Sequence, residues 1–134
     1  MFITDKITYF SIGIVENSIL EFVPPETIRA LESRLVLEPC FAPAVKALEV
    51  GQYVWVVYHL HYSGPWLDRM MPELFIRRVD CRPNPIGITL SRIVTLNDST
   101  ITVVGLDAID GSPILDIKPY KPIWDEPPVE PLDP

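Results

Sequence analysis

The sequence predicts a mainly β, single-domain protein in which the strands form a curled sheet or a β-barrel, with only short helices. Runs rich in β-branched and aromatic residues recur along the chain and end at residues typical of turns. Strands do not alternate with long helices, and none of the six glycines belongs to a G-x-G-x-x-G or P-loop pattern. We therefore expect a non-Rossmann fold.

The strand segments differ in pattern. Segment 53–62, YVWVVYHLHY, is apolar on both faces, as in a buried strand. Segment 86–96 alternates, so that Ile88, Leu90 and Arg92 share one face, and the turn sequence that follows predicts a hairpin with 100–106. In chain order, the predicted strands are 6–15, 34–39, 53–62, 74–79, 86–96, 100–106 and 113–118.

Short helices are predicted at 24–33 and 42–50. Prolines suit the first turn of the first helix, and Ile28 and Leu31 then follow at helical spacing. The C-terminal end is rich in proline and acidic residues and should be extended. We therefore divide the chain into a β domain, 1–122, and a Pro-rich acidic tail, 123–134.

Length and charge limit the classes of function. A chain of 134 residues fits one domain, and a net charge of −7 argues against a broad phosphate-binding surface. A local basic patch is still possible, since Arg77, Arg78, Arg82 and Arg92 are close in sequence. No apolar run approaches the roughly 18 residues of a membrane helix, and no signal peptide is visible, so the expected location is cytoplasmic.

The stretch CRPNPIG, 81–87, raises a structural and a functional interpretation. Each proline fixes its own φ and keeps the preceding residue extended, so Arg82 and Asn84 should point in defined directions. The stretch is either a rigid turn or a wall that presents these two side chains to a ligand.

Histidine and aspartate residues supply the other candidates. His59 and His61 would share one face of a strand, but no third metal ligand is apparent, so we expect no metal. A histidine at a strand end is instead a candidate donor or base. Asp107 and Asp110 suit turns, whereas Asp116 with Lys118 forms either a structural ion pair or part of a ligand site.

Two long motifs resemble those of a known family. The stretches CRPNPIGITLSRI (81–93) and VVGLDAIDGSPILDIKPYKP (103–122) resemble the R-P-N-P-I-G and L-D-x-x-D-G-T-P-V-L-D-I-K-P-Y motifs of the TrmO family, also called YaeB, VirR or TsaA-like. The chain departs from the family pattern at EFVPPETI, which replaces an F-G-I-P-R-Q loop, and at Val79-Asp80, which replaces Ser-Pro.

The resemblance implies a β-barrel methyltransferase that binds S-adenosylmethionine, usually as a homodimer, and that methylates N6 of threonylcarbamoyl-adenosine beside the anticodon of transfer RNA. His61 is our first candidate base and Asp116 our second. The implied cofactor-binding residues are His61, Tyr62, Arg78, Arg82, Asn84, Ile88, Leu115, Asp116, Ile117 and Lys118.

Two other functions compete with this one. The first is an S-adenosylmethionine-binding sensor or interaction module that has lost catalysis, which the acidic composition favours. The second is a plain dimeric β domain in which RPNPIG is only a turn.

Overall fold

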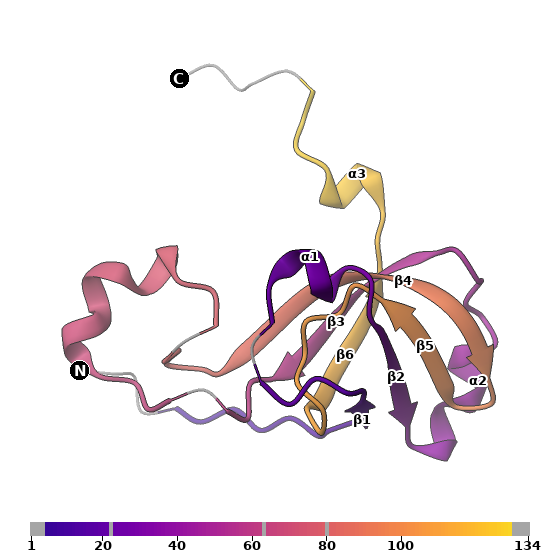
Figure 1. Ribbon diagram of the computed structural model, residues 1–134, viewed down its shortest axis with the longest axis horizontal. Coiled ribbons are helices and arrows are strands. Elements are labelled where there is room, and N and C mark those ends of the chain that lie inside the picture. The colour runs from indigo at the N-terminus through magenta and orange to yellow at the C-terminus, as the bar shows by residue number, and fades with distance from the viewer. Residues whose placement is uncertain (1–4, 22, 63, 80, 130–134) are drawn as a thin grey trace.

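The computed structural model describes residues 5–21, 23–62, 64–79 and 81–129. Six antiparallel strands close into a barrel in the order β1-β2-β5-β4-β3-β6 (Figure 1). The mainly β class and the barrel are thus confirmed. The strands are β1 (Gly13–Glu16), β2 (Glu32–Leu37), β3 (Tyr53–His59), β4 (Ile86–Asn97), β5 (Thr100–Val104) and β6 (Pro113–Pro119).

The helices are single turns, as the prolines at their starts allow. They are α1 (Pro25–Ile28), α2 (Ala42–Val45) and α3 (Pro122–Asp125), with 3-10 segments η1 (Pro39–Phe41) and η2 (Asp68–Ile76). Both predicted helices are therefore shorter than expected. None of the helices in the described ranges is long and apolar enough to cross a membrane.

The core fills the barrel with inward-facing side chains from every strand. Period-two alternation turns Val54, Val56 and Tyr58 of β3 inward, and each is at most 2% exposed. The other strands contribute in the same way, with Val15, Leu35, Ile93, Ile101, Val103 and Ile114 buried in one cluster.

The three C-terminal strands match the sequence prediction closely. β4 and β5 form the expected hairpin, and β6 pairs with β3. At the N-terminus the predicted strand 6–15 is much shorter in the structure, where β1 spans only Gly13–Glu16. Gly13 is a point of close approach between β1 and β2, because a Cβ there would lie 2.4 Å from the carbonyl oxygen of Val36.

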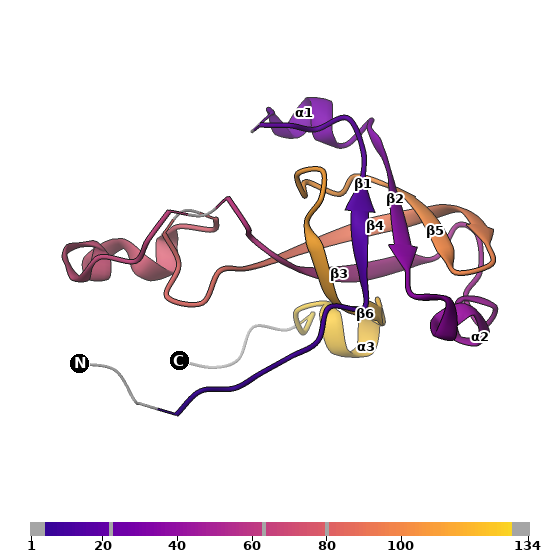
Figure 2. The same ribbon diagram turned by 90° about the horizontal axis from the view of Figure 1, so that it is seen from below.

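The predicted strand at 74–79 is wrong. Leu74 to Ile76 belong to η2, which extends away from the barrel in both views (Figures 1 and 2), and no strand of the described chain pairs with it. Pro72 lies inside η2, and Arg77 forms an ion pair with Glu73 one turn earlier. The β-rich composition of LFIRRV was misleading because strand propensity depends on context and does not by itself supply a pairing partner.

The tail prediction is met only in part. The stretch after β6 forms the helical turn α3 rather than a wholly extended chain, with the Lys121 amide donating to Asp125 Oδ2 at 2.6 Å. The division at residue 122 stays a prediction, and residues 130–134 of the tail lie outside the described residues.

One feature of β4 positions the candidate site. β3 pairs with β4 from Ile86 to Arg92, whereas β5 pairs with it only from Arg92 to Asn97. The β5-facing edge of β4 from Ile86 to Ser91 therefore has no strand partner, because the chain leaves β5 at Val104 and turns through Gly105, with φ +91°. The barrel wall opens at this point.

Candidate functional site

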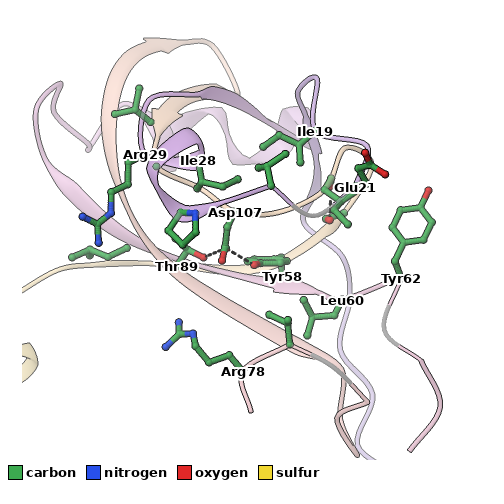
Figure 3. A pocket seen from close by; sticks show the side chains of 18 of the residues that line it. Ile19, Glu21, Ile28, Arg29, Tyr58, Leu60, Tyr62, Arg78, Thr89 and Asp107 are labelled. Carbon is green, nitrogen blue, oxygen red and sulfur yellow. Dashed lines mark hydrogen bonds between the residues drawn. The ribbon is translucent and has the colours of Figure 1, made fainter. Parts of the chain in front are cut away.

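A cavity of about 1050 Å³ lies against the unpaired edge of β4 (Figure 3). The segment around α1 forms one wall, the loop between β5 and β6 forms another, and the chain after β3 closes one end. Its polar and aromatic lining residues are Glu21, Arg29, Tyr53, Tyr58, His61, Tyr62, Arg78, Thr89, Arg92, Asp107 and Ser112.

Three hydrogen-bonding side chains meet inside the cavity. The Tyr58 hydroxyl donates to Asp107 Oδ1 at 2.7 Å, and the Thr89 hydroxyl donates to the same oxygen. Figure 3 shows Asp107 between these two partners. Burial, reinforced by the charge of Asp107, raises the pKa of Tyr58 well above its ordinary value, so this phenol stays protonated and remains a donor.

Gly87 makes room for the Tyr58 ring. A Cβ at this position would lie 2.5 Å from Tyr58 Cζ and 2.9 Å from its hydroxyl oxygen. Tyr58 and Gly87 face each other across the β3–β4 ladder, and both are buried. The glycine that ends the CRPNPIG stretch therefore allows a tyrosine to reach Asp107 through the barrel.

β3 ends at His59, so His61 lies beyond the strand. The alternation that was predicted to place both histidines on one strand face therefore does not extend to His61. Its Nδ1 is 3.3 Å from Ser112 Oγ, whose own hydrogen goes to the carbonyl oxygen of Ile109 at 2.6 Å. Since the one hydrogen of the Ser112 hydroxyl goes to Ile109, Nδ1 of His61 would act as the donor in this contact. The His61 and Tyr62 rings are 4.2 Å apart and tilted by 41°.

The cavity concentrates positive charge in an acidic chain. Arg29, Arg78 and Arg92 all line it, and none forms an ion pair with another described residue. Two carboxylates, Glu21 and Asp107, face them. The cavity can therefore bind a ligand that carries both an anionic group and a cationic or hydrogen-bond-donating group.

The structure brings together only some of the residues implied by the family resemblance. His61, Tyr62 and Arg78 line the cavity. Ile88 and Asp116 lie on the outer face of the barrel. They are the register partners of Val57 in the two strands beside β3, Ile88 in β4 and Asp116 in β6. Asp116 binds Lys118 there at 3.0 Å, while Leu115 sits at a register shift and Ile117 packs against the core.

Arg82 and Asn84 take part in local structure. Arg82 donates to the carbonyl oxygens of Leu74 and, at 2.8 Å, of Arg77, so it holds η2 against the CRPNPIG stretch. The carbonyl oxygen of Asn84 accepts from the amide of Ile86 at 2.8 Å. These contacts suit the rigid-turn interpretation, and a ligand-binding role for either side chain stays a prediction.

The sequence interpretation missed the central group of the cavity. Asp107 was assigned to a turn, and Tyr58, Thr89 and Arg29 were not singled out. A buried tyrosine needs a partner for its hydroxyl, and the alternation of β3 turns Tyr58 inward with Val54 and Val56, which is the signal that was available. The described residues contain no cluster of three or more His, Cys, Asp or Glu side chains suited to a metal ion.

Comparison with known proteins gives a consistent set of relatives. Residues 23–126 match the family model described as the tRNA-methyltransferase O N-terminal domain. The chain is 33% identical over 130 residues to a probable S-adenosyl-L-methionine-binding protein of Pyrococcus abyssi, covering 89% of this chain and 71% of that protein. It is 38% identical over 96 residues to the tRNA (adenine(37)-N6)-methyltransferase of Escherichia coli, covering 60% of this chain and 41% of that protein.

Solved structures agree with this result. A crystal structure of TrmO superimposes with a TM-score of 0.79 at 28% identity, covering 97% of this chain and 62% of that chain. TrmO from Pseudomonas aeruginosa gives a TM-score of 0.75 at 27% identity. The chain thus spans less than two thirds of these solved chains and of the Escherichia coli enzyme.

Proposed function

Because the chain belongs to the tRNA-methyltransferase O N-terminal domain family, we propose that it is an S-adenosylmethionine-dependent methyltransferase acting on N6 of adenine 37 in transfer RNA. The finer proposal, from the motif resemblance, is that this adenosine carries a threonylcarbamoyl group. The observation that carries the proposal is the cavity, which combines aromatic, cationic and carboxylate side chains from distant parts of the chain.

The cavity residues fit the chemistry of the cofactor. A methionine carboxylate favours a guanidinium partner, and Arg78 lies at the cavity wall without an ion pair to any of the described residues. A sulfonium favours aromatic faces and carboxylates, which His61, Tyr62 and Glu21 supply. The segment that replaces the family's F-G-I-P-R-Q loop also contributes Val23 and Pro25 to the wall.

In the reaction, the protein chiefly positions the two reactants and accepts a proton. S-adenosylmethionine, when bound, supplies an activated methyl group. Arg78, His61 and Tyr62 would hold it at one end of the cavity, so that the acceptor amine enters beside it and the two reactants remain in contact. A base in reach would take the proton that the amine loses. His61 lies in the cavity, whereas Asp116 does not.

An anticodon-loop base suits such a cavity. Bases in single-stranded loops can be turned outward, stacked on aromatic rings and recognised by their edges. This mode of binding needs few phosphate contacts, so the net charge of −7 is compatible with it. The expected cytoplasmic location stays a prediction.

We also propose that the chain acts as a homodimer. Ile88, Asp116 and Lys118 lie outside the cavity, but a second copy whose outer face meets the cavity mouth would add them to it. Exposed apolar side chains on that face support this arrangement, with Ile86 and Ile88 at 45% and 48% exposure. Sedimentation equilibrium at micromolar concentration should give the dimer mass, and a monomer would contradict the proposal.

Calorimetric titration with S-adenosylmethionine tests the proposed function first. We expect saturable binding, and no binding at millimolar cofactor would overturn both the methyltransferase and the sensor. If the cofactor binds, mass spectrometry of nucleosides from transfer RNA incubated with the protein separates the two. A new methyl group on the position-37 adenosine supports the enzyme, and its absence supports the sensor, which the acidic composition favours.

A further inference from the structure

We propose that Asp107 is the catalytic residue that accepts the proton of the acceptor amine, and that Tyr58 and Thr89 position its carboxylate. The inference rests on the proposed function and adds to it an acceptor subsite around Asp107. The cavity volume of about 1050 Å³ is at the upper end of small-molecule sites, which are roughly 300 to 1000 Å³.

The two oxygens of Asp107 have different surroundings. Oδ1 accepts from both the Tyr58 and the Thr89 hydroxyl. No hydrogen bond or ion pair within the described chain uses Oδ2. Asp107 itself is exposed to the cavity, so Oδ2 is available to a ligand that offers an N–H.

Tyr58 makes this carboxylate rigid. It is 2% exposed, and its ring is fixed between the barrel core and the backbone at Gly87. A hydroxyl held in this way fixes Oδ1 and therefore the direction of Oδ2, since the two oxygens belong to one planar group. A preorganised acceptor loses little in reorganisation when the substrate binds.

The other candidate bases are less well placed. Asp116 lies on the outer face and is paired with Lys118 at 3.0 Å. His61 is exposed, the one hydrogen-bond contact of its ring with a described residue is 3.3 Å long, and this ring lies against Tyr62 at the cofactor end. The remaining charged groups of the cavity come from other elements and are Glu21, Arg29, Arg78 and Arg92.

The proposed proton transfer balances. The acceptor nitrogen forms a bond to the methyl carbon, and the sulfur keeps the electron pair of the carbon–sulfur bond that breaks. The N–H bond breaks with its electron pair left on nitrogen, and the proton moves to Asp107 Oδ2, which becomes a neutral carboxylic acid. No oxidant, reductant or further reactant is needed.

Asp107→Asn is the decisive variant because it keeps the Oδ1 acceptor and the shape of the side chain. We expect turnover at saturating cofactor to fall about 10²- to 10⁴-fold. The cofactor dissociation constant should stay within about twofold, because the cofactor end is untouched. Asp98→Asn is the matched control, since Asp98 lies in the β4–β5 turn at φ +52°, a conformation that asparagine tolerates.

A binding measurement tests Asp107 without turnover. An anticodon stem-loop whose position-37 adenosine carries a threonylcarbamoyl group on N6 keeps one N6–H, and it should bind wild type about tenfold more tightly than the same stem-loop methylated at that nitrogen, because only the former donates to Oδ2. Asp107→Asn should lose this preference. Tyr58→Phe should lower kcat with KM unchanged, as expected for a positioning residue.

The outcomes separate the two proposals. If wild type methylates transfer RNA and Asp107→Asn retains turnover within about threefold, the assignment of Asp107 is wrong and the proposed function stands. If wild type gives no methylation, the proposed function fails, and the stem-loop preference still decides whether Asp107 faces an N–H donor. An equal preference in wild type and Asp107→Asn overturns the subsite.

Discussion

The barrel mouth and the outer face of β3, β4 and β6 both carry residues of the family motifs, but they are built differently. At the mouth, a tyrosine that is 2% exposed holds Asp107, and Gly87 fixes the tyrosine. On the outer face, Asp116 and Lys118 form an ion pair with each other, and their side chains are 47% and 67% exposed, respectively. Solvent screens such a pair and leaves it mobile. We therefore place the motif residue held by a buried partner at the proposed catalytic end, and the exposed ones on the surface proposed to meet a second copy.

Gly87→Ala tests the mouth with the largest expected effect. The new methyl group overlaps the Tyr58 ring, so the ring must move out of the core and away from Asp107. Overpacking of this severity destabilises by about 3 kcal/mol. Urea unfolding should show a lower midpoint at an unchanged slope.

A double-mutant cycle gives the control for Gly87→Ala. In a Tyr58→Leu background the clashing atoms Cζ, Cε2 and the hydroxyl oxygen are absent, so the cost of Gly87→Ala should fall below about 1 kcal/mol. An equal cost in both backgrounds would show that the glycine serves another purpose.

Arg78→Ala tests the cofactor end with the next largest effect. If a charge-assisted contact to the cofactor is lost, binding should weaken by about 1 to 3 kcal/mol in a calorimetric titration. Arg77→Ala is the matched control, because Arg77 is adjacent in sequence but its guanidinium binds Glu73 at 3.0 Å and it does not line the cavity. Equal affinities of the two variants would remove Arg78 from the site.

The strands of the barrel were largely readable from local pattern, whereas the arrangement of the site was not. β4 and β5 follow from alternation and a turn sequence, both of which are local. LFIRRV has the same composition but is no strand, because strand formation depends on a pairing partner from elsewhere in the fold. Composition alone does not report whether a segment meets such a partner.

Asp107 shows the same limit at the level of one residue. Its sequence context is that of a turn, and its partners Tyr58 and Thr89 lie 49 and 18 residues away. The motif resemblance includes Asp107, as the first aspartate of L-D-x-x-D-G, but the cofactor-binding residues that we took from it near this loop lie on the following strand β6. Burial of the tyrosine hydroxyl depends on the tertiary structure, and only the closed barrel brings the three side chains together.

Asp116→Asn tests the outer face and has the smallest expected effect. The Ile117 amide bonds to Asp116 Oδ1 at 2.9 Å, and asparagine keeps that acceptor, so the main loss is the exposed ion pair with Lys118. We expect the free energy of unfolding to change by less than about 1 kcal/mol. If the outer face joins the site through a second copy, the cofactor dissociation constant should rise no more than about fivefold, with turnover at saturation retained. A fall in saturated turnover as large as that of Asp107→Asn would instead make Asp116 the proton acceptor, and the division between mouth and outer face would then be wrong.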